Sequence, residues 1–107
     1  MSAILPNSSR FEAPVYGTVF AERSAVLRRL KEGDRLILVP DPPGVDEPSV
    51  WVHAPGGDVV GHLSPDINAW MAPRMMHGAR YAAAVTSVGA PDTESWKRLV
   101  IEVRRVD

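Results

Sequence analysis

The middle third of the chain, residues 33–63, constrains the fold most, because short apolar runs alternate there with turns rich in proline and glycine. Residues 35–39 and 49–53 are predicted strands, and a Pro-Gly-Gly-Asp turn at 55–58 leads into a third strand at 59–63. The loop between the first two strands contains four prolines. Each proline fixes φ at about −65° and has no N–H to donate. The pattern therefore predicts a small antiparallel sheet that presents a stiff loop, a good position for a recognition residue.

The remaining strands lie on either side of this segment. Residues 11–20 form a strand-like pattern, whose early part Pro14 restricts to the edge of a sheet. Residues 80–88 and 97–106 are two further predicted strands. The run at 35–39 is apolar throughout after its arginine, which predicts a buried strand.

A first helix is predicted over residues 24–32. Val26, Leu27 and Leu30 share one face of it, and the basic side chains between them face water. Gly33 is the expected C-terminal stop, because glycine adopts the left-handed conformation that commonly ends a helix.

A second helix is predicted to begin at Ser64, a good N-cap, with Pro65 at the first helical position. Pro73 lies inside this helix and predicts a kink or a break there. Gly78 is expected to end the segment. The apolar residues at helical spacing are interpreted as core: Ile67, Trp70, Met71 and Met75.

These elements predict a mostly β fold with two short helices, arranged as a small six-stranded antiparallel barrel. No strand–helix–strand unit is long enough for a doubly wound parallel sheet. The length of 107 residues suits one domain. We expect a flexible N-terminal tail at 1–10 and a single domain at 11–107.

The charge distribution argues against tight non-specific binding to nucleic acid. The net charge is −1, but residues 36–66 carry five acidic side chains and neither Lys nor Arg, whereas 1–35 and 67–107 each carry six basic and four acidic groups. The middle third would repel a phosphate chain laid along it, unless the flanking arginines fold over it.

Most function classes lack their sequence signatures. There is no phosphate-binding P-loop, no dinucleotide-binding glycine motif and no nucleophile elbow, so we expect no enzyme activity and no cofactor. There is no cysteine, no apolar run long enough to span a membrane and no visible export signal, and the cytoplasm is the expected compartment. Ten arginines against two lysines indicate a GC-rich, bacterial coding bias.

Two groups of residues allow alternative interpretations. Trp51 alternates with Val50 and Val52, so it is either a core residue, which we favour, or an exposed platform for a base. The adjacent acids Asp46 and Glu47 suit loop solvation better than a general acid/base pair, because neighbours on an extended chain point to opposite sides. The three histidines are far apart, and no ligand spacing supports a metal site.

From about residue 15 to residue 106 the chain resembles the HIRAN domain family. The resemblance rests on the order and spacing of several segments rather than on one motif. These segments are Tyr16-Gly17, Leu-Arg-Arg-Leu-Lys-Glu-Gly-Asp at 27–34, Leu-Ile-Leu-Val at 36–39, Asp-Glu-Pro-Ser-Val-Trp-Val at 46–52, Gly-His-Leu at 61–63, and the helix at 66–73 with its stop at Gly78.

The resemblance implies a compact six-stranded barrel related to OB folds, flanked by two helices. It also implies a module that captures the 3′ end of single-stranded DNA. Carried over by position, Phe20 would stack a base, Asp46 would accept a hydrogen bond from the terminal 3′-hydroxyl, and His62 would face a phosphate. Trp51, Arg23 and Val45 are secondary candidates.

Several contacts of the DNA-binding members are missing from this chain. Val19 replaces an arginine, Val45 replaces the second stacking aromatic, and Pro65 or Asp66 replaces a lysine. One lost stack removes roughly 1–3 kcal/mol, so the resemblance predicts a weak binder of single-stranded DNA.

Three hypotheses of function remain open. The leading one is a non-catalytic module for DNA 3′ ends, in which about half of the family's DNA contacts are kept. The second is a protein-interaction or scaffold domain on the same frame, with a partner such as a helicase or nuclease. The third, a hydrolase that uses Asp46 or Asp58 with His62, is the most distant.

Overall fold

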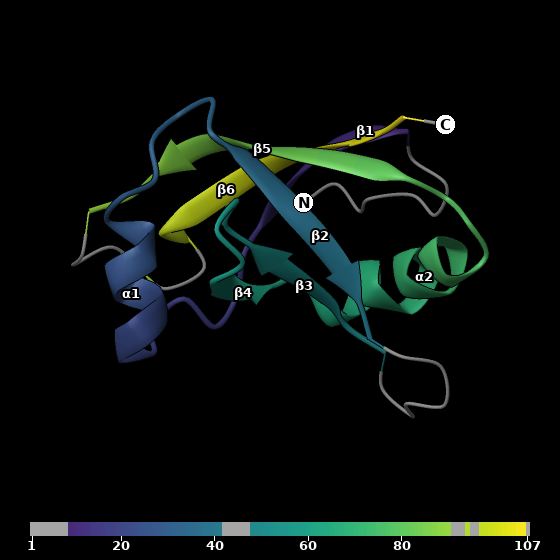
Figure 1. The fold of residues 1–107 in the computed structure, drawn as a ribbon, viewed down its shortest axis with the longest axis horizontal. Helices are drawn as coiled ribbons and strands as arrows, with labels where there is room; N and C mark the ends of the chain where they lie inside the picture. The colour runs from purple at the N-terminus through teal and green to yellow at the C-terminus, as the bar shows by residue number, and fades with distance from the viewer. Residues whose placement is uncertain (1–8, 42–47, 91–93, 95–96, 107) are drawn as a thin grey trace.

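The computed structural model describes residues 9–41, 48–90, 94 and 97–106. In these residues six strands form one antiparallel sheet in the spatial order β1-β6-β5-β2-β3-β4. The strands are β1 (Arg10–Pro14), β2 (Arg35–Pro40), β3 (Val50–His53), β4 (Val59–His62), β5 (Tyr81–Val88) and β6 (Leu99–Arg105). The helices α1 (Ala21–Leu27) and α2 (Pro65–Met76) lie at opposite ends of the curled sheet (Figure 1). The predicted fold class is confirmed.

The sheet closes on itself through one backbone pairing. The first and last strands in the spatial order are β1 and β4, and Tyr16, just beyond β1, pairs with His62 in β4. The N–H of Tyr16 donates to the carbonyl of His62 at 2.8 Å, and the N–H of His62 donates to the carbonyl of Tyr16 at 3.0 Å. This pair bridges the two edges and brings the chain around residue 17 next to β4.

Gly61 makes the closure sterically possible. A Cβ at this position would overlap the carbonyl oxygen of Tyr16 and come within 2.6 Å of Cγ1 of Val15. Val15 is fully buried and the carbonyl belongs to the bridging pair, so neither neighbour can move without opening the barrel. The glycine is needed here for close approach of two backbones.

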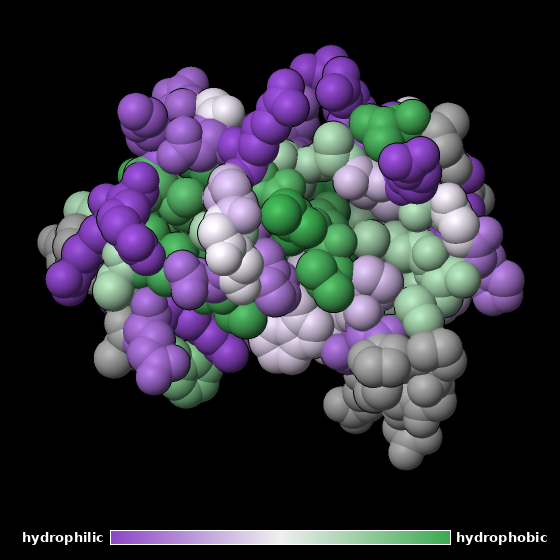
Figure 2. All heavy atoms as spheres, viewed as in Figure 1, coloured by the Kyte–Doolittle hydropathy of each residue, from purple (hydrophilic) through white to green (hydrophobic). Residues whose placement is uncertain are grey.

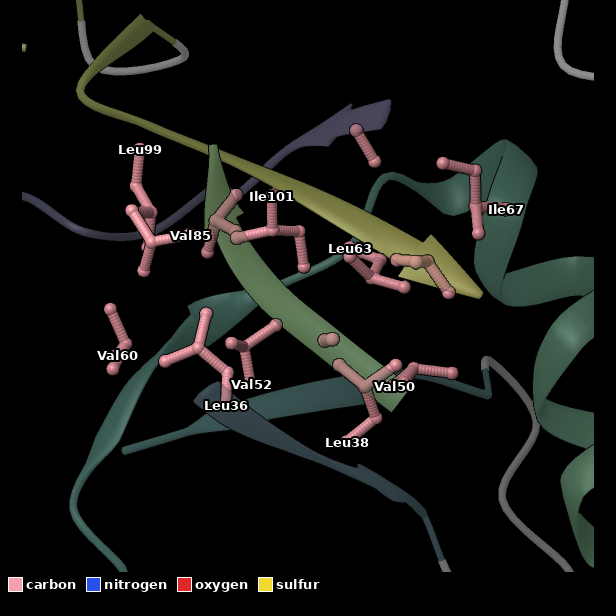
Figure 3. Close-up of a cluster of buried hydrophobic side chains, with 14 of the residues drawn as sticks. Leu36, Leu38, Val50, Val52, Val60, Leu63, Ile67, Val85, Leu99 and Ile101 are labelled. Atoms are coloured by element: carbon pink, nitrogen blue, oxygen red, sulfur yellow. The ribbon is translucent and has the colours of Figure 1, made fainter. Parts of the chain in front are cut away.

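The core fills the inside of the curled sheet (Figure 3). Its members come from every strand, because alternate residues of each strand point inward. They include Leu36, Leu38, Val50, Val52, Val60, Leu63, Ile67, Val85, Leu99 and Ile101. Of the predicted core residues of the second helix, Ile67 and Met71 are buried, and Trp70 and Met75 are half-buried against the cluster.

One buried polar side chain ties α2 to the sheet. Asn68 is 4% exposed; its Oδ1 accepts from the N–H of Val50 at 2.9 Å, and its Nδ2 donates to the carbonyl of Leu63 at 3.0 Å. The first bond satisfies the N–H of Val50 at the start of β3, and the second reaches the carbonyl of Leu63 just beyond β4. The helix is thereby fixed against the two strands that carry Trp51 and His62.

The structure corrects the predicted bounds and the predicted stop of the first helix, and it excludes a break at Pro73 in the second. The first helix spans Ala21–Leu27 rather than 24–32, because Arg29 and Leu30 bond to carbonyls three residues back and tighten the chain into a turn. Gly33, at φ 91°, lies in the turn into β2 and does not end the helix. Pro73 does not break α2, which continues to Met76 and loses only one backbone donor.

The prediction of a buried strand at 35–39 is also wrong. Leu36 and Leu38 are buried in β2, but Ile37 is 48% exposed and Val39 is 38% exposed. Only one face of the sheet packs against the core. Because every residue from Leu36 to Val39 is apolar, the sequence pattern did not show that inward-facing and outward-facing residues alternate. Figure 2 shows the resulting hydrophobic patch at the centre of the outer face, over β2.

Neither described helix is long and apolar enough to cross a membrane.

Gly61→Ala should destabilise the fold by about 2 kcal/mol or more, because the added methyl group overpacks the closure of the barrel. Urea denaturation measures the change. Gly56→Ala is the matched control: nothing lies within 4 Å of the added Cβ and φ is not positive, so its effect should stay within about 0.5 kcal/mol. Equal stabilities of the two variants would contradict the closure described here.

Candidate nucleic-acid interface

Four side chains form a row across the outer face of the barrel. Val39 pairs with Trp51, Trp51 pairs with His62, and His62 pairs with Tyr16. Residues directly opposite in antiparallel strands project to the same side of the sheet. We call this set the cross-strand row.

Trp51 belongs to the outer face, so the core interpretation favoured from the sequence is wrong. Its neighbours Val50 and Val52 are each 0% exposed, and successive side chains alternate between the faces. Trp51 is half-buried by its neighbours on the surface rather than by the core.

The rings of the cross-strand row touch one another. Those of Trp51 and His62 meet edge to face, with centroids 5.6 Å apart, and those of Tyr16 and His62 are stacked with centroids 6.3 Å apart. Nδ1 of His62 lies 2.9 Å from the carbonyl of Leu63. Because a carbonyl only accepts, Nδ1 carries the proton. Nε2 of the neutral ring is then an acceptor.

Arg23 of α1 contacts the cross-strand row at Trp51. Its Nη1 donates to the carbonyl of Gly17 at 3.0 Å. Its guanidinium carbon lies 4.8 Å from the ring centroid of Phe20 and 5.6 Å from that of Trp51. One cation therefore contacts two aromatic rings that come from different parts of the chain.

Gly17 is the position where these groups converge. Its φ is 75°, and an added Cβ would lie 2.9 Å from Nη1 of Arg23 and 3.3 Å from Nε2 of His62. Any other residue would be strained and would push the two side chains away.

Phe20 is the most exposed large apolar side chain of the site, at 61%. It is the N-cap of α1 and has an extended backbone, φ −63° and ψ 139°. The guanidinium of Arg23 covers one face of the ring. The rest of the ring is open to a ligand.

Asp41 anchors both Trp51 and the base of the proline-rich loop. Its Oδ1 accepts from Nε1 of Trp51 at 2.7 Å, and its Oδ2 accepts from the N–H of Ser49 at 2.9 Å. Its own N–H donates to the carbonyl of Ser49 at 2.9 Å. Sequence reasoning missed this residue, although an Asp before prolines at a strand end is a common partner for nearby backbone N–H groups.

The structure therefore gathers four of the sequence candidates: Phe20, Arg23, Trp51 and His62. Asp46 and Val45 lie outside the described residues.

Of the alternative catalytic and metal-binding residues, the described ones, His53, Asp58 and His62, form no cluster. Asp58 faces Arg29 at 3.7 Å in the turn between β3 and β4, and Nδ1 of His53 bonds to the carbonyl of Gly57 at 2.9 Å. Among the residues that the structure describes, no three His, Asp or Glu side chains lie close enough to hold a metal.

The arginines do fold over the acidic middle third. Arg23 covers Trp51, and Arg29 pairs with Asp58. Both come from the basic first third of the chain, and Asp58 is the acidic side chain of the middle third that one of them pairs with.

Comparison with solved structures identifies the fold. The HIRAN domain of human HLTF superposes with a TM-score of 0.60 over 91% of this chain and 73% of that one, at 15% sequence identity. No protein-family model matches the chain, and no curated protein matches it. The chain has the fold of a HIRAN domain, and the resemblance found in the sequence is confirmed at that level.

Asp41→Ala should lower the free energy of unfolding by about 1–3 kcal/mol, because it leaves two donors without their partner. It should also move the indole N–H resonance of Trp51, one of three in the chain, which Trp51→Phe assigns. Asp58→Ala removes only an exposed ion pair and should change neither quantity by much. An unmoved Trp51 resonance in Asp41→Ala would refute the anchoring role.

Proposed function

We propose that this chain is a non-catalytic module that binds the 3′ end of single-stranded DNA, and binds it weakly. The observation that carries the proposal is the exposed ring of Phe20, backed by the guanidinium of Arg23, beside Trp51 and His62. Aromatic rings interleaved with a cation are what proteins use to hold unpaired bases.

Stacking supplies most of the affinity. A base on the free face of Phe20 is worth roughly 1–3 kcal/mol, whatever its identity. Bases inside a duplex are stacked on both faces, so this contact favours unpaired DNA. The loop carboxylate of Asp46 accepts from the terminal 3′-hydroxyl, which a phosphate at that position would repel.

His62 contributes according to its protonation. With Nδ1–H held by the carbonyl of Leu63, the neutral ring offers Nε2 as an acceptor to a hydroxyl or a base N–H. Only the imidazolium donates from Nε2 to a phosphate oxygen. The fixed ring thus presents a single nitrogen to the ligand in either state.

A hydrolase is the less supported interpretation. Asp58 faces Arg29, and His62 is surrounded by Tyr16 and Trp51. Such an enzyme would have to depend on Asp46, which the binding proposal already uses as an acceptor.

Fluorescence anisotropy with short oligonucleotides tests the proposal. An unpaired 3′-hydroxyl end should bind more tightly than the same strand with a 3′-phosphate, and Asp46→Asn should reduce this difference.

Phe20→Ala should weaken binding roughly 5- to 150-fold. Met76→Ala, which removes an apolar side chain of α2 that is 39% exposed, should have no effect. Equal affinity for both ends would remove Asp46 from its role, and unchanged binding by Phe20→Ala would contradict the proposal.

A second candidate function is supported by the exposed apolar side chains of β2. Ile37 and Val39 are 48% and 38% exposed on the same outer face, and apolar patches of this kind are typical of protein contacts. A scaffold function predicts a stable protein partner, such as a helicase or nuclease, that Ile37→Glu releases. It also predicts no gel shift of oligonucleotides at low salt.

A further inference from the structure

We propose that Arg23 binds the phosphodiester that joins the last two nucleotides of the bound strand. This inference rests on the proposed function and adds a ligand contact to it. It assigns the principal phosphate contact to α1, rather than to the loop position where the family resemblance places an arginine. That position holds Val19, which is 48% exposed and carries no charge.

The charge of Arg23 is not neutralised by any carboxylate among the described residues. Arg10 pairs with Glu102 at 2.9 Å, and Arg29 faces Asp58 at 3.7 Å. Arg23 is half-buried and instead contacts a carbonyl oxygen and two rings. A partly desolvated cation in this setting gains more from an anionic ligand than an exposed arginine that already has a partner.

Three contacts position the guanidinium before any ligand arrives. Nη1 is bonded to the carbonyl of Gly17, and the rings of Phe20 and Trp51 lie 4.8 and 5.6 Å from the guanidinium carbon. A guanidinium has five N–H donors, and this bond occupies one of them. The remaining donors suit two oxygens of one phosphate group, which arginine binds in a bidentate manner.

The position of Arg23 between two rings identifies the phosphate. A terminal base on the free face of Phe20 and the preceding base at Trp51 would be splayed apart on either side of the guanidinium. The linkage that connects these two nucleotides then passes over Arg23. Beyond Trp51 the cross-strand row offers Val39 on one side and His62 on the other. Val39 is apolar, and His62 donates to a phosphate oxygen only as the imidazolium, so Arg23 is the permanent cation of this part of the site.

The salt dependence of binding separates a phosphate contact from a purely structural role. For single strands, each phosphate contact contributes about 0.7 to the slope of log affinity against log salt concentration. Arg23→Gln should lower the slope by about 0.7 and weaken binding about tenfold at low salt. Arg23→Lys should keep the slope while losing part of the affinity, because it keeps the charge without the planar fork. Arg10→Gln removes a charge already paired with Glu102, so it should change neither the salt slope nor the affinity.

A second experiment uses the wild-type protein and therefore does not depend on the folding of a variant. Oligonucleotides are prepared with one uncharged methylphosphonate at the first, second or third linkage from the 3′ end. Substitution at the first linkage should weaken binding about tenfold, and substitution at the third should have little effect. In Arg23→Gln, with folding verified by urea denaturation, the penalty at the first linkage should disappear.

The outcomes distinguish this inference from the proposed function. If wild-type protein binds and Arg23→Gln weakens binding with an unchanged slope, Arg23 only positions the rings and the inference fails. An equal penalty at all three linkages in the wild-type protein also overturns it. If wild-type protein binds no oligonucleotide at low salt, the proposed function itself fails, and the inference fails with it.

Discussion

The candidate site depends on the backbone pairing between Tyr16 and His62. This pair closes the barrel, and it places the turn at Gly17 against the end of β4. Without it, the strand that leads to Phe20 and Arg23 would end at an open sheet edge, away from Trp51. Gly61 permits the approach, since any side chain there would collide with the carbonyl of Tyr16. The geometry of the candidate site therefore follows from the steric requirement of closure.

Closure also determines the electrostatics of the outer face. The acidic middle third carries Trp51 and His62, and the basic first third supplies Arg23 and Arg29 only because the barrel brings the two together. The result is a face with few cations and several rings. Such a surface holds a strand through stacking and a small number of phosphate contacts, which explains why we expect weak binding that does not extend along a nucleic-acid chain.

Much of the architecture was predictable from local pattern, because turns marked by glycine and proline and alternating apolar residues define strands one by one. The orientation of Trp51 was not predictable. The neighbouring strand is apolar throughout Leu36–Val39, so its sequence does not show which of its faces is buried. The role of Gly61 and the meeting of Arg23 with Trp51 depend on contacts between segments distant in sequence. The position of Asp41 before prolines at a strand end could have predicted its bonds to nearby backbone groups, but nothing in the local sequence predicts its bond to Trp51. Asp46 remains a prediction, because it lies outside the described residues.

Chemical-shift mapping by NMR tests the central claim most directly, namely that the closed outer face holds the strand end. A short single-stranded oligonucleotide with a 3′-hydroxyl is titrated into isotope-labelled protein. The account predicts that the largest shifts fall on Gly17, Phe20, Arg23, His62 and the indole N–H of Trp51. Shifts confined to the opposite part of the sheet, around Arg35, Ala82 and Arg104, would contradict it.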